Sequence, residues 1–122
     1  MPDFQRSVTL QDFGTAMLAG FASLHRQVLP VRRLDTSLVS SYELLREKLI
    51  PVRFYLVTDE LHGDCMEARQ AVVGAVSRGC GFFEDDKLCI TITPREADKY
   101  FDNLPGDGDL WIEAAERALL NL

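Results

Sequence analysis

Apolar residues in the first quarter of the chain follow a helical period. From residue 10 to residue 28 they recur at steps of three or four positions, which predicts an amphipathic helix that ends before Pro30. Thr9 has the chemistry of its N-terminal cap, with Asp12 three positions later. Because most other residues of this helix are small, we expect a neighbouring element to approach it closely. The small residues are Gly14, Ala16, Ala19, Gly20, Ala22 and Ser23.

Caps and helix-breaking residues predict two further helices. The first begins between residues 35 and 37 and ends before Pro51. The second begins at Asp64, because Asp64 and Glu67 have the spacing of a capping box. It ends at Gly79, since glycine is favoured just after the last turn of a helix.

Strand patterns occupy other stretches. Residues 52–58, with the sequence VRFYLVT, are apolar on both faces, which predicts an interior strand covered on two sides. Residues 82–93 have the pattern of a hairpin with a polar tip at residues 84–87. Alternation over residues 4–9 permits a short edge strand. The second strand of the hairpin is expected to bury three alternate residues, namely Leu88, Ile90 and Ile92.

The last part of the chain predicts two helices and completes the fold class. Thr93 and Glu96 form a second capping box, and the short helix that follows ends before Pro105. A final helix is expected to begin at Asp109 and to bury Trp111. The predicted order is therefore (β)ααβαββαα. It corresponds to one α+β domain over residues 1–122, in which about five helices cover a small, mostly antiparallel sheet of three or four strands.

Length and composition restrict the class of protein further. A chain of 122 residues can bury a core without metal or disulfide cross-links. We expect no membrane span, because no segment approaches the roughly 20 apolar residues that a bilayer requires. The three cysteines, an odd number without a C-x-x-C spacing, are typical of a reducing compartment, so a cytoplasmic location is expected.

Charge is divided unevenly along the chain. Residues 1–53 have a balance of +2 and residues 54–122 a balance of −8, which gives the net charge of −6. Caps and turns account for part of this acidity, and the rest lies at the hairpin tip and on the short helix before Pro105. If these two elements lie side by side, they form an acidic docking face; if they point apart, the charge serves solubility. The predicted partner-binding residues are Glu84, Asp85, Asp86, Asp98 and Asp102.

A thiol site is the alternative functional centre. Cys65 lies at the start of a predicted helix, where the positive end of the helix lowers the pKa of a thiol. His62 could act as its base, and Asp59 or Asp64 could orient the imidazole. Two acidic neighbours oppose this effect by raising the pKa of the thiol, and the capping box already accounts for Asp64 and Glu67.

No motif in the chain predicts a metal ion, a cofactor or direct nucleic-acid binding. The candidate ligands His62, Asp64, Cys65 and Glu67 lie too close together in sequence to surround a tetrahedral metal ion. Neither of the glycine-rich phosphate-binding motifs occurs, and no helix-turn-helix pattern is present.

These observations favour a non-enzymatic protein-binding module. A compact acidic domain can cover a positively charged cleft, so the expected partner is a basic protein, such as a nucleic-acid-active enzyme or a toxin. The predicted class is a bacterial inhibitor, immunity protein or antitoxin-like protein. Arg32 and Arg33 could instead meet an acidic partner or a second copy of the chain. The alternative is a small thiol-dependent or ligand-binding enzyme centred on Cys65.

Overall fold

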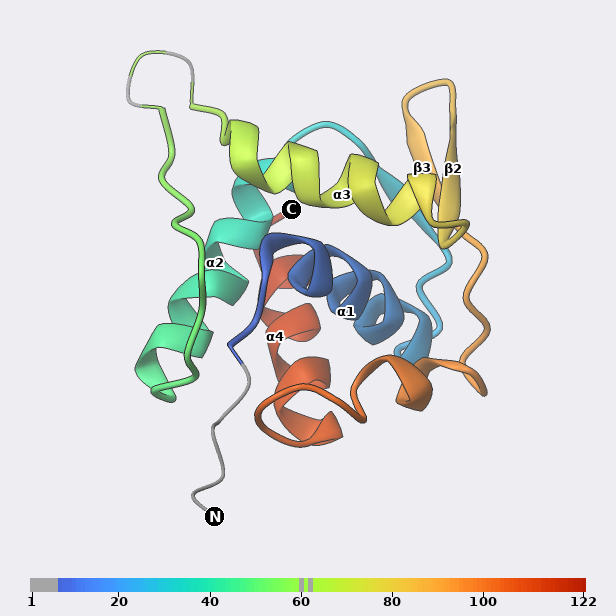
Figure 1. Cartoon of the computed structure of the whole chain (residues 1–122). Helices are drawn as coiled ribbons and strands as arrows, with labels where there is room; N and C mark the ends of the chain where they lie inside the picture. Colours follow the sequence, from blue (N-terminus) through green and yellow to red (C-terminus); the bar gives the residue numbers. More distant parts are fainter. Residues whose placement is uncertain (1–6, 60, 62) are drawn as a thin grey trace.

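A computed structural model of the chain describes residues 7–59, 61 and 63–122. Within these residues the fold is α+β, with four α-helices, one short 3-10 helix and a three-stranded sheet (Figure 1). In chain order the elements are α1 (Leu10–Ser23), β1 (Val28–Pro30), α2 (Leu34–Glu47), α3 (Met66–Ser77), β2 (Gly81–Glu84), β3 (Lys87–Ile90), η1 (Ala97–Tyr100) and α4 (Gly108–Leu120).

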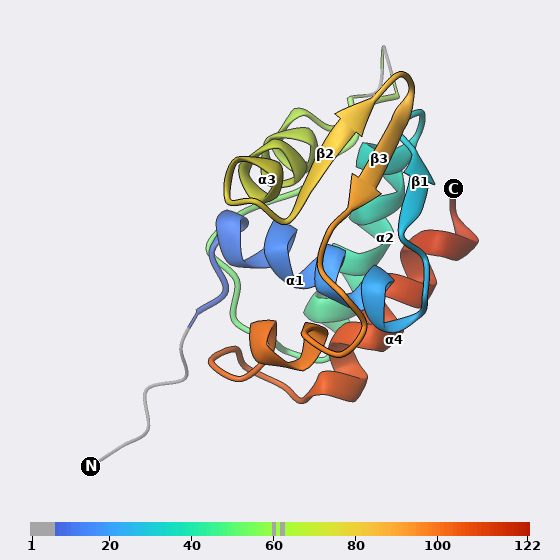
Figure 2. The same ribbon diagram turned by 90° about the vertical axis from the view of Figure 1, so that its right-hand side faces the viewer.

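The sheet is antiparallel and has the order β1-β3-β2. It lies to one side of the helices, and its hairpin stands beside the C-terminal end of α3 (Figures 1 and 2). The predicted hairpin is confirmed, because Leu88 and Ile90 of β3 are buried while Lys87 is exposed. Leu88 pairs with Leu29 and with Phe83, so these three side chains share the face that points toward the core.

Helix α1 is at the centre of the helical core. It begins as predicted, with a capping box between Thr9 and Asp12. Its small residues allow close packing on two sides. A Cβ atom on Gly14 would lie 2.7 Å from the Ala71 carbonyl carbon of α3, and one on Gly20 would lie 2.8 Å from the Ala115 Cβ of α4. The expected close approach is therefore made by helices on both sides of α1.

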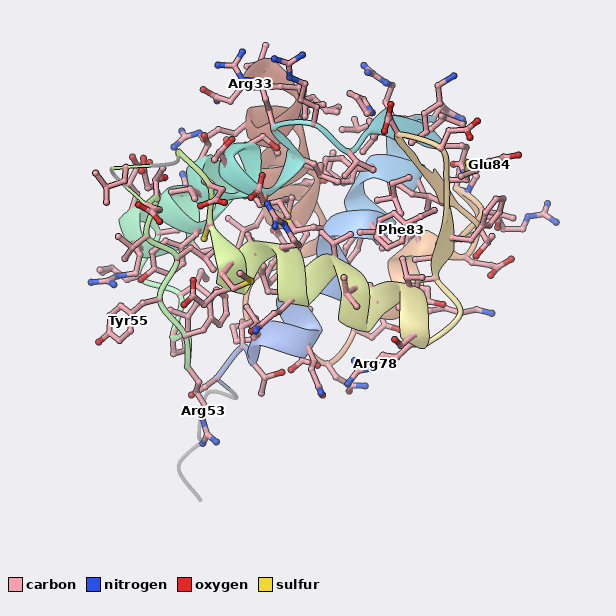
Figure 3. The ribbon with its side chains drawn as sticks, turned by 90° about the horizontal axis from the view of Figure 1, so that it is seen from above. Arg33, Arg53, Tyr55, Arg78, Phe83 and Glu84 are labelled. Carbon is pink, nitrogen blue, oxygen red and sulfur yellow. The ribbon has the colours of Figure 1, made fainter. Side chains whose placement is uncertain are left out.

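The interior strand predicted over residues 52–58 is wrong. Within the described residues this stretch is extended but makes a single isolated bridge, in which Val52 lies parallel to Val8. Its side chains still alternate: Phe54 packs against aromatic rings of α1 and α2, while Tyr55 is 73% exposed and points away from the body of the protein (Figure 3). Side-chain burial therefore holds the stretch in place, and a strand does not form because no neighbouring strand supplies a hydrogen-bond ladder.

Two predicted helices also change, and one predicted strand is largely untested. The first helix ends at Ser23, and the chain then turns at His25, which has a φ of 60°, into β1, an element that the sequence analysis missed. The predicted strand at residues 4–9 lies mostly outside the described residues. The helix expected after Thr93 is reduced to η1, although Thr93 accepts a hydrogen bond from the Glu96 backbone N–H.

None of the helices in the described part of the chain is long and apolar enough to cross a membrane.

Candidate functional site

The thiol of Cys65 is buried rather than presented to solvent. Cys65 is the N-cap of α3 and is 1% exposed. Burial raises the pKa of its thiol, and the carboxylate of Glu67, 3.9 Å from Sγ, raises it further. Backbone N–H groups of the first turn lower the pKa but do not reverse the shift. His62, the predicted base, lies outside the described residues.

Asp35 has a structural role that the sequence analysis missed. Its Oδ2 accepts a hydrogen bond from the Cys65 backbone N–H at 3.0 Å and one from Arg69 Nη2 at 3.2 Å. The predicted capping box between Asp64 and Glu67 is wrong, because among the described residues no side chain caps α3 and Asp64 instead lies 3.7 Å from Arg69. The carboxylate of Asp35, in α2, thus holds the start of α3. Asp35 and Cys65 are 30 residues apart in sequence, so no local motif predicts this contact.

We expect Cys65 and Cys80 to resist alkylation in the folded protein, since both are buried and burial raises the pKa of both thiols. Cys89 is partly exposed and should react at least roughly tenfold faster with iodoacetamide near neutral pH. Mass spectrometry of peptides after timed alkylation measures the three rates. Reaction of Cys65 as fast as Cys89 would contradict this assignment and restore the thiol site.

The acidic residues of the hairpin tip, Glu84, Asp85 and Asp86, lie together where β2 turns into β3. Glu84 is directly opposite Lys87, so part of its charge is compensated across the turn. Asp85 has a φ of 55°, a left-handed conformation that aspartate tolerates in turns. The backbone carbonyl of Asp86 accepts a hydrogen bond from the Val31 N–H. Part of the acidity at the hairpin tip is therefore accounted for by the roles of these residues in forming the turn.

The other two predicted acids lie in a denser acidic cluster. Asp98 of η1 and Asp102 just after it line a hollow of about 490 Å³ together with Asp107 and Asp109 from the start of α4. We call these four residues the aspartate end. Asp107, rather than the predicted Asp109, caps α4 by accepting a hydrogen bond from the Leu110 N–H at 2.9 Å. The remaining lining residues are Phe101, Gly106 and Gly108, so no basic side chain is among them.

The hairpin tip and the aspartate end lie at opposite ends of the molecule. In both ribbon views the turn between β2 and β3 is at one end, and η1 with the start of α4 is at the other (Figures 1 and 2). The five predicted partner-binding residues thus belong to two separate groups, so the single docking face considered from the sequence does not form. Asp107 and Asp109, which the sequence did not single out for partner binding, make the aspartate end an acidic surface of its own.

A metal site is not indicated in the part of the chain that the structure describes, where no three His, Cys, Asp or Glu residues are placed to hold an ion. Comparison of the chain with models of protein families, with curated proteins and with solved structures gives no match. The evidence on function therefore comes from the surface of the structure.

Proposed function

We propose that this protein is a non-enzymatic binding module whose aspartate end docks on a basic protein. The observation that supports this most is the convergence of four aspartates on one hollow whose described lining has no basic residue. Such a surface accelerates encounter with a positively charged partner and rejects acidic competitors. None of the four forms an ion pair within the described residues. Asp107 caps α4, and the charges of Asp98, Asp102 and Asp109 are available to a partner.

The proposed partner is a protein with a positive cleft, such as a nucleic-acid-active enzyme or a toxin, and the chain would then act as an inhibitor, immunity protein or antitoxin-like protein. A rigid support favours this role. Asp107 and Asp109 stand on the first turn of α4, which is fixed in the core by the fully buried Trp111. A preorganised surface loses little conformational entropy on binding. The described cysteines are all free, which fits the reducing conditions of a cytoplasm.

The thiol-dependent alternative receives no support from geometry. The Cys65 sulfur is covered, the pKa of its thiol is raised, and the carboxylate of Glu67 lies 3.9 Å from it. A nucleophilic cysteine requires the opposite environment, a partly exposed thiol beside positive charge.

Two triple variants test the proposed role of the aspartate end. One is Asp98→Asn, Asp102→Asn and Asp109→Asn, which leaves the capping residue Asp107 intact. The matched control is Glu84→Gln, Asp85→Asn and Asp86→Asn at the hairpin tip. Each removes three negative charges, so both change the net charge from −6 to −3. We expect the first to reduce capture of basic proteins on an affinity column by roughly tenfold, and the control to reduce it less than about twofold.

Quantitative mass spectrometry of the captured proteins provides the comparison, and circular dichroism checks that both variants are folded. Equal losses in the two variants would mean that net charge alone matters, and the proposed docking end would be rejected. Unchanged capture by both variants would mean that neither group of acidic residues attracts the partner.

A further inference from the structure

A groove beside α3 lies on the face opposite the aspartate end. Its volume is about 1030 Å³, compared with about 490 Å³ at the aspartate end. Its walls are the start of α2 with the preceding turn, the outer face of α3, the hairpin tip and three residues before α3, namely Thr58, Gly63 and Asp64. Figure 3 looks down on this region, with Arg33 on one side of it and the hairpin on another. Binding sites for small molecules commonly have volumes of about 300–1,000 Å³, so its size suits such a ligand.

One side of the groove is apolar. Phe83 shares the core-facing side of the hairpin with Leu88, yet it is 43% exposed because it reaches past the covered part of the sheet. Figure 3 shows Phe83 on the α3 side of the hairpin and Glu84 on the other. Val72 and Val73 of α3 and Val31 before α2 line the same hollow. An exposed aromatic ring beside aliphatic side chains offers a surface on which the apolar body of a ligand can be buried.

The opposite wall is positively charged. Arg69 adds no net positive charge, since it lies 3.2 Å from Asp35 and 3.7 Å from Asp64, and these three residues together have a charge of −1. Arg32 and Arg33 also line the groove, and neither forms an ion pair within the described residues. The remaining charged residue of the lining is Asp85 at the hairpin tip. The two guanidinium groups therefore form the positive part of the groove, and the carboxylate of Asp85 repels an anion from the hairpin side.

The first turn of α2 adds to the positive character of this wall. Arg33 occupies the N-cap position, and no side chain in the described part of the chain caps the helix. The carboxylate of Asp35, which could have done so, is directed to Cys65 and Arg69 instead. Among the described residues, the backbone N–H groups of Asp35 and Thr36 have no acceptor. Backbone donors at a helix start reinforce nearby cations in binding a negative group.

We propose that this groove binds one small organic anion, with an aromatic or branched aliphatic body against Phe83 and the valines of α3 and an acidic group at Arg32 and Arg33. The combination of a large half-apolar hollow with two unpaired guanidinium groups carries this inference. It is independent of the docking role of the aspartate end, because the two sites share no residue.

A pair of fluorescent probes with one ring system tests both halves of the site. The anionic probe is 8-anilino-1-naphthalenesulfonate, and the neutral control is N-phenyl-1-naphthylamine, which has the same rings without the sulfonate. We expect one molecule of the anionic probe to bind the folded protein saturably. Phe83→Ala should weaken both probes by about threefold or more, because it removes part of the apolar wall.

The charge of the site is tested by Arg32→Gln with Arg33→Asn, in which asparagine tolerates the φ of 66° at position 33. The matched control is Arg26→Gln with Arg53→Gln, which removes the same charge outside the groove. The groove variant should weaken the anionic probe by about fivefold and the neutral probe by less than about twofold, with the control near wild type. Failure of saturable one-to-one binding, or equal effects of the two double variants, would overturn the proposal.

Competition then identifies the acidic group. 3-Phenylpropionate and phenyl phosphate should each displace the anionic probe, and their ranking distinguishes a carboxylate from a phosphate ligand. Inorganic phosphate at the same concentration should displace much less, because it lacks an apolar body. If inorganic phosphate displaces the probe as well as phenyl phosphate does, or if an acidic peptide displaces it and neither small anion does, the proposed ligand class is wrong.

Discussion

Gly14→Ala should destabilise the protein by about 2–4 kcal/mol, the largest effect that we expect from adding a single methyl group. The new Cβ would lie 2.7 Å from the carbonyl carbon of Ala71 and closer still to its oxygen. Because that neighbour is backbone in the middle of α3, the two helices have to separate. The intrinsic preference of alanine for helices, about 1 kcal/mol over glycine, offsets only part of this cost.

Gly74→Ala is the matched control within the same helix pair. Gly74 lies in α3, and an added Cβ there would meet nothing within 4 Å. This variant should therefore stabilise the protein by about 0.5–1 kcal/mol through helix propensity alone. Urea unfolding of both variants gives the two free energies of unfolding. Stabilisation by both substitutions would contradict the close packing of α1 on α3.

Asp35→Ala should lower the free energy of unfolding by about 2–3 kcal/mol. The carboxylate of Asp35 is 11% exposed and serves two donors, the Cys65 N–H and the Arg69 guanidinium. Without it, a buried backbone donor at the start of α3 loses its partner. The cost stays below that of a fully buried ion pair because Arg69 is 53% exposed and water can solvate it.

Two variants separate the parts of this effect. Asp35→Asn retains a side-chain oxygen for the Cys65 N–H and loses only the charge, so we expect a loss of about 1 kcal/mol. Asp64→Ala removes the weaker contact to Arg69 at 3.7 Å, from a side chain that is 41% exposed, and should change stability by less than about 0.5 kcal/mol. If Asp64→Ala lowered the free energy of unfolding as much as Asp35→Ala, the conclusion that Asp35 is the main partner of Arg69 would be wrong.

The sequence predicted those elements whose cause is local. The cap at Thr9, the hairpin with Leu88 facing inward and the helix that buries Trp111 each depend on residues a few positions apart. The interior strand at residues 52–58 failed because a strand depends on a partner, and the pattern of its own side chains contains no information about one. Strand β1 was missed for the same reason. Its three residues have no strand pattern of their own and form a strand because they pair with β3.

In the candidate sites, too, the sequence predicts what depends on neighbouring residues and misses what depends on distant ones. The sequence identified Asp98 and Asp102 as acidic surface, but their association with Asp107 and Asp109 depends on how η1 packs beside the start of α4. Nor could it indicate that Asp35 would hold Cys65, or that Phe83 and Arg33 would face one groove. Each of these contacts joins elements far apart in the chain, where no sequence period or cap applies.

We propose that the aspartate end, rather than acidity as such, recruits a basic partner. The most direct measurement of this is the association rate of a captured basic protein at about 50 mM and about 300 mM salt, for wild type and both triple variants. Electrostatic steering weakens as the screening length falls. We predict that wild type and the hairpin-tip variant slow by roughly tenfold at the higher salt, whereas the variant at Asp98, Asp102 and Asp109 associates slowly at both. Equal salt dependence in all three proteins would contradict the claim.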